Sequence, residues 1–249
     1  MPVSEMETAE AQSAAAGGEV KRAYVQRIFS QIAPSYDFLN HLLSFNIDKA
    51  WRRRAIAALG WDRVPRGTYV DLCAGTLDVS AALAREPGFQ GRVIGADFAE
   101  PMLRAGRGKA SAEVVTPVVA DALDLPLPNA TAAGGIVAFG IRNVTDLDRA
   151  LREMRRVLAP GGRFVILDFT TPRNAIVRML YHAYFHHILP WIGALVSGHR
   201  TAYAYLPRSV ANFPNAENLA ARMREAGFES VQWRELSLGI AAIHVGTKP

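Results

Sequence analysis

The chain has 249 residues, half of them apolar, which is enough to build one α/β domain with additions or two small domains. This composition excludes a chain that is disordered over most of its length. The net charge of +5 suits contact with nucleic acid or anionic lipid, or simply an arginine-rich solvated surface. The single cysteine, Cys73, excludes an internal disulfide and is typical of a reducing cytoplasm.

The first 19 residues are rich in Ala, Glu, Ser and Gly and contain no basic residue. We therefore expect a disordered tail rather than a signal peptide, followed by one domain over residues 20–249. Residues 20–32 have helical spacing, with Val20 and Tyr24 on one face together with Ile28 and Ile32.

Residues 33–37 interrupt this helix at a proline, and residues 40–59 predict one or two further helices. Three successive arginines, Arg52 to Arg54, fit either a solvated helix face or a face that attracts an anionic bilayer.

From Thr68 onward, short apolar runs alternate with helical patterns. Strands are predicted at 68–73, 92–97, 114–120, 134–139 and 163–169, and helices at 78–85, 100–109 and 147–158. Such alternation predicts a Rossmann-like α/β fold with a parallel sheet, helices on both faces, and ligands beyond the carboxyl ends of the strands.

The apolar segment 170–209 does not continue the alternation, and we expect helices inserted after the fifth strand. The pattern then resumes with a helix at 216–226 and strands at 230–235 and 239–246.

Residues 179–197 lack charged side chains and approach the length of a membrane span, but three histidines and a proline argue against a transmembrane helix. His182 and His186 share a helical face beside His187, yet no pattern of further ligands accompanies them, so we expect packing or interfacial roles and no metal.

The first strand leads through a glycine turn into the helix that begins at Asp78. Asp71 and Gly75 flank this turn, which lacks the full glycine set of a dinucleotide site. A nucleoside cofactor without phosphates is therefore expected, and S-adenosylmethionine is the candidate. Gly75 permits close approach of the ligand, Thr76 adds a hydroxyl, and the backbone N–H groups suit a carboxylate.

Acidic residues end the next two strands. Asp97 suits the two ribose hydroxyls, although it could equally cap the following helix. Asp121 can accept from the adenine amino group, with the Ala122 N–H donating to the ring, or serve only as a turn residue. After the fourth strand, Arg142 and Asn143 suit an oxygen-bearing substrate; the alternative is a structural arginine paired with a carboxylate such as Asp146.

These pieces together resemble the ubiquinone/menaquinone biosynthesis C-methyltransferase family, of the demethylmenaquinone methyltransferase-like kind, from about Val20 to the C-terminus. The stretches that carry the resemblance are Tyr36–Ser44 with Trp51 beyond it, Phe139–Val144, Arg156–Thr170 and Glu225–Val231. One departure concerns the cofactor: Leu77 stands where the family usually has a second glycine.

The resemblance implies a seven-stranded class I sheet of the S-adenosylmethionine-dependent methyltransferases, with N-terminal helices and a helical lid at 170–209. It also implies a polyprenylated quinol as substrate. By matching position, the cofactor contacts would be Thr76, Asp97, Asp121, Ala122 and Ala138.

The implied reaction moves a methyl group from the sulfonium to a ring carbon of the demethylquinol, without a metal. We expect Arg142 and Asn143 to stabilise the phenolate oxygen. Asp78 is the candidate base, acting directly or through water, and Tyr36 the candidate for orienting the substrate or closing the site.

The lid segment is expected to cover the isoprenoid tail and to touch the inner face of the membrane, as a peripheral contact of a cytoplasmic protein; the alternative is a homodimer interface. No nucleic-acid partner is expected. Three other functions stay open: methylation of another small apolar or phenolic substrate, a non-catalytic role in a quinone-synthesis complex, and an NAD-dependent enzyme, which the missing G-x-G-x-x-G motif disfavours.

Overall fold

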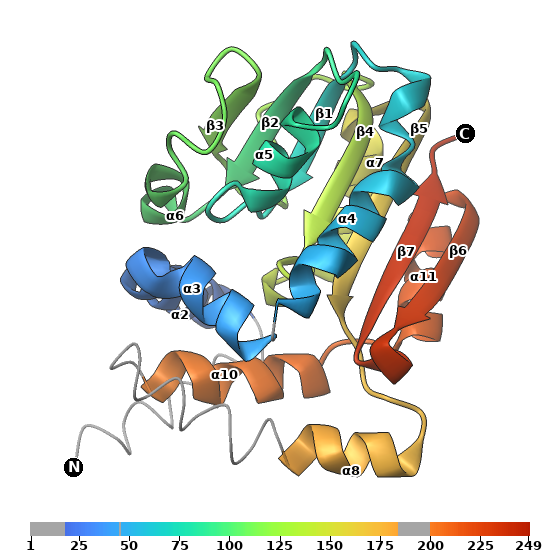
Figure 1. The fold of residues 1–249 in the computed structure, drawn as a ribbon. Coiled ribbons are helices and arrows are strands. Elements are labelled where there is room, and N and C mark those ends of the chain that lie inside the picture. The colour runs from blue at the N-terminus through green and yellow to red at the C-terminus, as the bar shows by residue number, and fades with distance from the viewer. Residues whose placement is uncertain (1–17, 45, 184–199) are drawn as a thin grey trace.

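A computed structural model describes residues 18–44, 46–183 and 200–249, which form a seven-stranded sheet flanked by helices (Figure 1). The strand order is β3-β2-β1-β4-β5-β7-β6. The strands are β1 (Thr68–Leu72), β2 (Arg92–Asp97), β3 (Val115–Val119), β4 (Ala132–Ala138), β5 (Leu158–Phe169), β6 (Glu229–Leu236) and β7 (Ala241–Thr247). The first five pair in parallel, and β7 runs antiparallel to both β5 and β6. The predicted Rossmann-like α/β sheet is confirmed.

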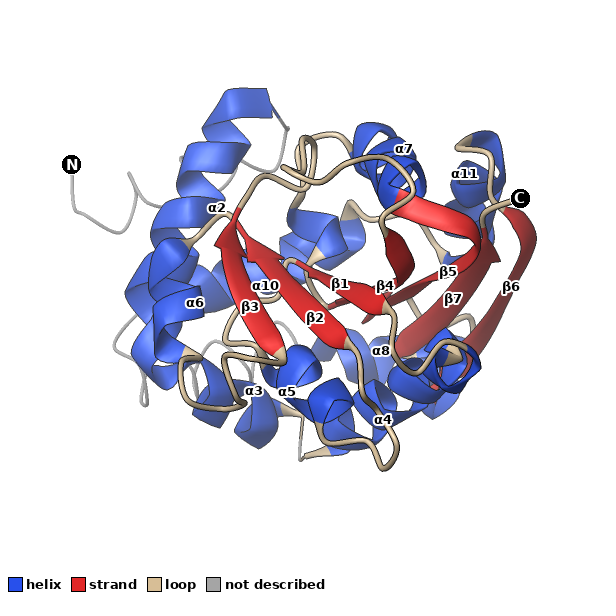
Figure 2. Cartoon of the chain, turned by 90° about the horizontal axis from the view of Figure 1, so that it is seen from above, coloured by secondary structure: helices blue, strands red, loops and turns tan. Residues whose placement is uncertain are grey.

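Two helical layers cover the sheet (Figure 2). The helices are α4 (Ile47–Leu59), α5 (Asp78–Ala84), α6 (Glu100–Ala105), α7 (Leu147–Val157) and α11 (Ala216–Glu225). Phe164 and Ile166 of β5 belong to the core beneath α7 and α11, whereas Val165 and Leu167 belong to the core beneath α4 and α5. Successive side chains of a strand point to opposite faces, so a strand that is covered on both faces reads as a continuous apolar run.

A third group of helices lies across the carboxyl ends of the strands (Figure 1). They are α2 (Gly18–Ile32), α3 (Tyr36–Leu43), α8 (Ala175–Ala183) and α10 (Arg200–Ala211). Tyr24 and Ile28 of α2 share a small core with Tyr181 of α8 and Tyr205 of α10, and the rings of Tyr24 and Tyr205 lie 5.7 Å apart. The N-terminal helices and the helical insertion thus close one end of the sheet.

Some of the predicted features fall outside the described residues. Residues 1–17 of the expected tail and residues 184–199 of the insertion, with His186 and His187, are among these. Gly18 and Glu19, which were assigned to the tail, begin helix α2. Within the described ranges, no helix is long and apolar enough to cross a membrane.

The structure corrects several predicted boundaries. Val20, expected on the same face as Tyr24, is 55% exposed, and the buried face of α2 runs through Tyr24, Val25 and Ile28 instead. Helix α6 ends at Ala105 rather than at Lys109. A Cβ at the next position, Gly106, would lie 2.4 Å from the carbonyl oxygen of Thr76. The chain can pass this close to the glycine turn only because residue 106 has no side chain.

Strand β5 begins at Leu158, which was predicted to end a helix. Leu158 pairs with Ala132, and the register shifts before Arg163 pairs with Gly134. The Pro160-Gly161-Gly162 turn, which lies between the predicted helix 147–158 and the predicted strand 163–169, is therefore an irregularity inside a longer strand. Near the C-terminus, Gly239 lies in a short 3₁₀ helix, Ser237–Gly239, and not in β7.

Candidate functional site

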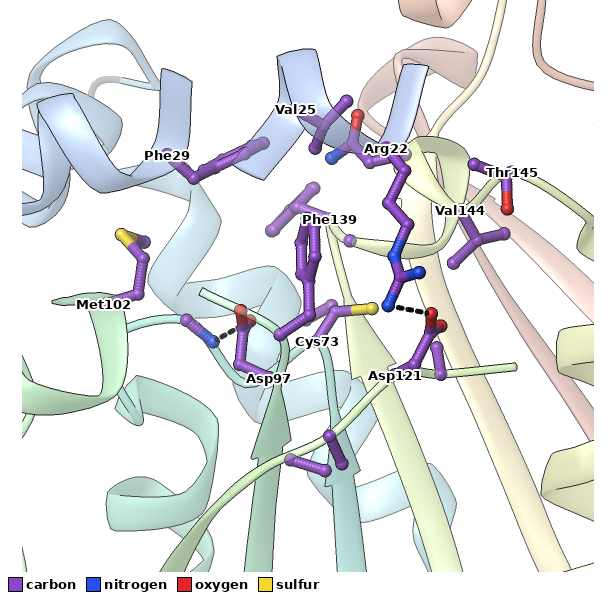
Figure 3. A pocket seen from close by; sticks show the side chains of 18 of the residues that line it. Arg22, Val25, Phe29, Cys73, Asp97, Met102, Asp121, Phe139, Val144 and Thr145 are labelled. Carbon is purple, nitrogen blue, oxygen red and sulfur yellow. Dashed lines mark hydrogen bonds and ion pairs between the residues drawn. The ribbon is translucent and has the colours of Figure 1, made fainter. Parts of the chain in front are cut away.

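A pocket opens at the carboxyl ends of β1 to β4, beneath helix α2 (Figure 3). Seven of the predicted site residues line it: Tyr36, Gly75, Asp97, Asp121, Ala122, Ala138 and Asn143. Parallel strands bring their carboxyl ends to the same edge, so residues that are far apart in the sequence meet there.

The glycine turn after β1 is tied to the end of β2 by Asp97. The Gly75 N–H donates to Asp97 Oδ2 at 2.8 Å, and the Ala99 N–H donates to Oδ1 at 2.9 Å. Burial raises the pKa of Asp97, while these backbone hydrogen bonds act in the opposite direction. Asp97 therefore ties the glycine turn to the segment before α6 and also lines the pocket, but it does not cap α6, whose N-cap residue, Ala99, has no side-chain cap.

Asp121 is engaged on both of its oxygens. Its Oδ1 accepts from the Leu123 N–H at 2.9 Å, as expected of a turn residue, and its Oδ2 lies 3.0 Å from an Arg22 guanidinium nitrogen. Arg22 reaches down from α2 to make this ion pair (Figure 3). An adenine ring bound at this position would have to share the Asp121 carboxylate with Arg22.

Helix α2 contributes three pocket residues that the sequence did not predict: Arg22, Val25 and Phe29. Their spacing of three and four residues places them on one face of the helix. On the neighbouring turns, Lys21 Nζ donates to the Val144 carbonyl at 2.7 Å, and Gln26 Nε2 donates to the Phe98 carbonyl at 3.1 Å. The helix is thus anchored to loops on two sides of the pocket.

Four of the predicted residues are not among the described residues that line the pocket: Asp71, Thr76, Asp78 and Arg142. Asp71 is buried, accepts from the Ser80 N–H at 2.9 Å and from its hydroxyl at 2.6 Å, and is not among the described residues that line the pocket. Burial raises the pKa of Asp71 to about 7. These contacts favour a structural role that joins β1 to α5, and the predicted cofactor contact of Asp71 stays untested.

Thr76 and Asp78 join a group of charged side chains beside the pocket. The Thr76 hydroxyl donates to Asp37 of α3, and Lys109 Nζ donates to Asp37 and, at 2.6 Å, to Asp78. Because Asp78 is held by Lys109 at the start of α5, its predicted role as a base stays a prediction that no contact supports.

Arg142 is buried and paired with Asp168 at 2.7 Å, not with Asp146, which caps α7 instead. Burial alone would lower the pKa of Arg142, but Asp168 raises it above the usual range. Its Nη1 also donates to the Phe139 carbonyl at 2.5 Å. Within the described part of the chain, Arg142 Nε and the neighbouring Asn143 Oδ1 are buried without a hydrogen-bond partner.

Leu77 turns away from the pocket. Its backbone is left-handed, with φ of 63°, and its side chain is 4% exposed. A Cβ added at Gly95 would lie 2.4 Å from Leu77 Cδ2, so the side chain fills the space above β2 that this glycine leaves. The described residues that line the pocket do not include Leu77, so a leucine at this position does not crowd the pocket.

The described residues contain no group of three or more His, Cys, Asp or Glu that could hold a metal ion.

A family model for the ubiE/COQ5 methyltransferase family matches residues 18–248. Among relatives, a demethylmenaquinone methyltransferase of Thermus thermophilus is 48% identical over 89% of this chain and 100% of its own length. The ubiquinone/menaquinone biosynthesis C-methyltransferase UbiE of Geobacter sulfurreducens is 42% identical over 90% of this chain and 88% of its own. Among solved structures, a SAM-dependent methyltransferase of Thermotoga maritima has the same fold, with a TM-score of 0.64 at 21% identity over 90% and 99% of the two chains.

We expect Asp71 to make the free energy of unfolding fall as the pH rises from about 4 to about 7. The folded state keeps the Asp71 proton up to a pKa of about 7, whereas the ordinary pKa of an aspartate side chain is 3.8. The folded state therefore binds more protons in this window, and the loss is at most about 1.4 kcal/mol per pH unit. Asp71→Asn keeps an oxygen acceptor for Ser80, so its stability relative to the wild type should rise with pH in urea titrations. A difference that is independent of pH would contradict this assignment.

Proposed function

The chain belongs to the ubiE/COQ5 methyltransferase family, and we propose that it methylates a ring carbon of a polyprenylated quinol, a precursor of menaquinone or ubiquinone. It is an S-adenosylmethionine-dependent methyltransferase with the seven-stranded sheet of that class. One observation carries the proposal for the substrate. The cofactor pocket adjoins two buried polar atoms, Arg142 Nε and Asn143 Oδ1, that have no partner among the described residues.

The residues of the pocket fit an adenosine-bearing cofactor. When bound, S-adenosylmethionine supplies an electrophilic methyl group on a positively charged sulfur. Asp97 would accept from the ribose hydroxyls, and Asp121 and Ala122 would meet the adenine. A Cβ at Gly75 would stand 3.4 Å from Met102 Cε and 3.9 Å from the Tyr36 ring, so its absence leaves room for a ligand against the turn.

Arg142 would stabilise the quinol oxygen, and Asn143 Oδ1, which accepts, would orient the quinol hydroxyl. Buried polar groups normally find a partner, so the free Arg142 Nε–H is a donor held ready for an oxygen atom. Asp168 fixes the guanidinium, which lies 5.4 Å from the centre of the Phe169 ring. A donor held in place before the reaction stabilises the phenolate charge as it develops on the ring oxygen.

Tyr36 lines the pocket, and its proposed role is that of a hydrogen-bond donor rather than a base. Burial raises the pKa of its phenol, so the hydroxyl stays protonated at neutral pH. It is therefore suited to orient a substrate oxygen, as the sequence predicted, while the base remains Asp78 or a water molecule that Asp78 orients.

Helix α8 is the candidate membrane contact. Ile176 and Met179 are 66% and 63% exposed, three residues apart on one helix, and the exposed cation Arg178 lies between them. A polyprenylated substrate partitions into the bilayer, so contact with the anionic cytoplasmic face would bring the pocket to it. A homodimer that covers the same helix is the alternative.

Leu77, in place of the family's second glycine, would support a non-catalytic role only if its side chain blocked the pocket, and that side chain is buried away from it.

The function is tested by calorimetry with S-adenosylmethionine and by methyl transfer to demethylmenaquinol and to a polyprenyl benzoquinol. We expect cofactor binding and transfer to at least one quinol. Asp97→Ala should weaken cofactor binding by about 10- to 100-fold, because a charge-assisted hydrogen bond contributes about 1.5–3 kcal/mol. Glu113→Ala, at an exposed site, is the control. Cofactor binding with no transfer to either quinol would favour another phenolic substrate, and no binding at all would contradict the proposal.

Arg142 should act on turnover rather than on cofactor affinity. We expect Arg142→Gln combined with Asp168→Asn, which leaves no buried charge unpaired, to lower kcat by about 10²–10³-fold. The exposed Arg152→Gln on α7 is the control. Equal losses of kcat and cofactor affinity, measured by kinetics and calorimetry, would remove Arg142 from the phenolate site.

The membrane contact predicts that the protein sediments with vesicles that contain anionic phospholipid. Ile176→Glu with Met179→Glu should abolish sedimentation, because it places two carboxylates against the anionic surface. Val64→Glu, at an exposed position before β1, should leave sedimentation unchanged. If the wild type ignores vesicles and the double variant instead dissociates a dimer in light scattering, the dimer alternative holds.

A further inference from the structure

A cluster of charged side chains lies beside the pocket and joins four segments of the chain. The cluster consists of Asp37 of α3, Asp48 and Arg52 of α4, Asp78 of α5, and Lys109 of the loop after α6. Arg52 lies 3.3 Å from Asp48 and 3.8 Å from Asp78, and Lys109 contacts both Asp37 and Asp78. The proposed reaction assigns no role to Lys109.

Lys109 is the cation between two carboxylates that would otherwise face each other. The side chains of Asp37 and Asp78 are 34% and 22% exposed, and that of Lys109 is 25% exposed, so solvent screens this site only in part. The backbone of Lys109 is held as well, because its N–H donates to the Gly106 carbonyl at 3.2 Å and its own carbonyl accepts from Arg85.

The cluster reaches the pocket through Asp37. This residue directly follows Tyr36, the first residue of α3, which lines the pocket. Asp37 is tied to the glycine turn by the Thr76 hydroxyl and to the loop after α6 by Lys109. The Tyr36 ring stands against Gly75 on one side and packs edge-on against Phe29, with the ring centres 5.8 Å apart. The direction in which Tyr36 enters the pocket is thus set where α3 begins.

We propose that Lys109 is a positioning residue: by neutralising and joining Asp37 and Asp78, it fixes the start of α3 and with it the Tyr36 hydroxyl in the pocket. The effect of Tyr36 on the reaction rests on the proposed function, whereas the position of Tyr36 in the pocket does not depend on it. Without the ammonium group, two partly buried carboxylates repel each other. The start of α3 then moves and takes Tyr36 with it.

The test uses Lys109→Met, which keeps the length of the side chain and removes the charge, and Lys109→Met with Asp37→Asn, which also removes the repulsion. Arg104→Met is the matched control, because Arg104 forms an exposed ion pair with Glu100 on the same helix and lies outside the cluster. The whole protein is labelled with 3-fluorotyrosine, and the ¹⁹F resonance of Tyr36 is assigned by its loss in Tyr36→Phe.

We expect Lys109→Met to shift or broaden the Tyr36 resonance and to lower kcat by about 10- to 100-fold, as a displacement near 1 Å can do, while affinity for S-adenosylmethionine stays close to that of the wild type. The double variant should move the resonance and kcat back toward the wild type, and Arg104→Met should change neither.

An unchanged Tyr36 resonance in Lys109→Met would overturn the proposal, as would a loss of cofactor affinity as large as the loss of kcat. Because the resonance is measured without substrate, it tests the positioning even if the wild type methylates no quinol, so the two failures are distinguishable.

Discussion

The hydrogen bond from the Gly75 N–H to the Asp97 carboxylate holds the site together. It joins the turn after β1 to the end of β2, and it leaves a pocket between these two strand ends and helix α2. The turn can reach Asp97 because Cys73, Gly75 and Leu77 all have a left-handed backbone, with φ of 54°, 52° and 63°. Two of these residues are not glycine, so the turn carries strain that the surrounding packing must offset.

Leu77 shows how that strain is offset. A left-handed backbone at a residue with a side chain costs about 1–2 kcal/mol, and full burial of a leucine contributes about 1.5–3 kcal/mol. The two terms are of similar size, so a leucine in place of a glycine is tolerated as long as its side chain enters the core. The same left-handed geometry that strains the backbone directs the side chain toward Gly95 and keeps the pocket clear.

Much of the site could be predicted from the sequence because carboxyl ends of parallel strands meet at one edge, which brings Gly75, Asp97 and Asp121 together. The sequence could not show that Asp97 lines the pocket and Asp71 does not, since both are acids near the end of a strand. Register separates them: Asp71 pairs with Gly95, two residues before Asp97, and so lies about 7 Å deeper along the sheet. Arg22 was not predicted, because the sequence of α2 does not show that this helix packs across strand ends that are far from it in the chain.

The proposed role of Arg142 in the reaction would account for the buried pair Arg142–Asp168, which stability alone explains poorly. A buried ion pair contributes little net stability, because desolvation of both charges offsets their attraction, and an apolar pair of similar volume often serves as well. This pair also leaves Arg142 Nε without a partner among the described residues, which adds a cost of about 1–3 kcal/mol. Arg142 directly precedes Asn143, which lines the cofactor pocket. A ligand oxygen that accepts from Arg142 Nε would therefore offset this cost.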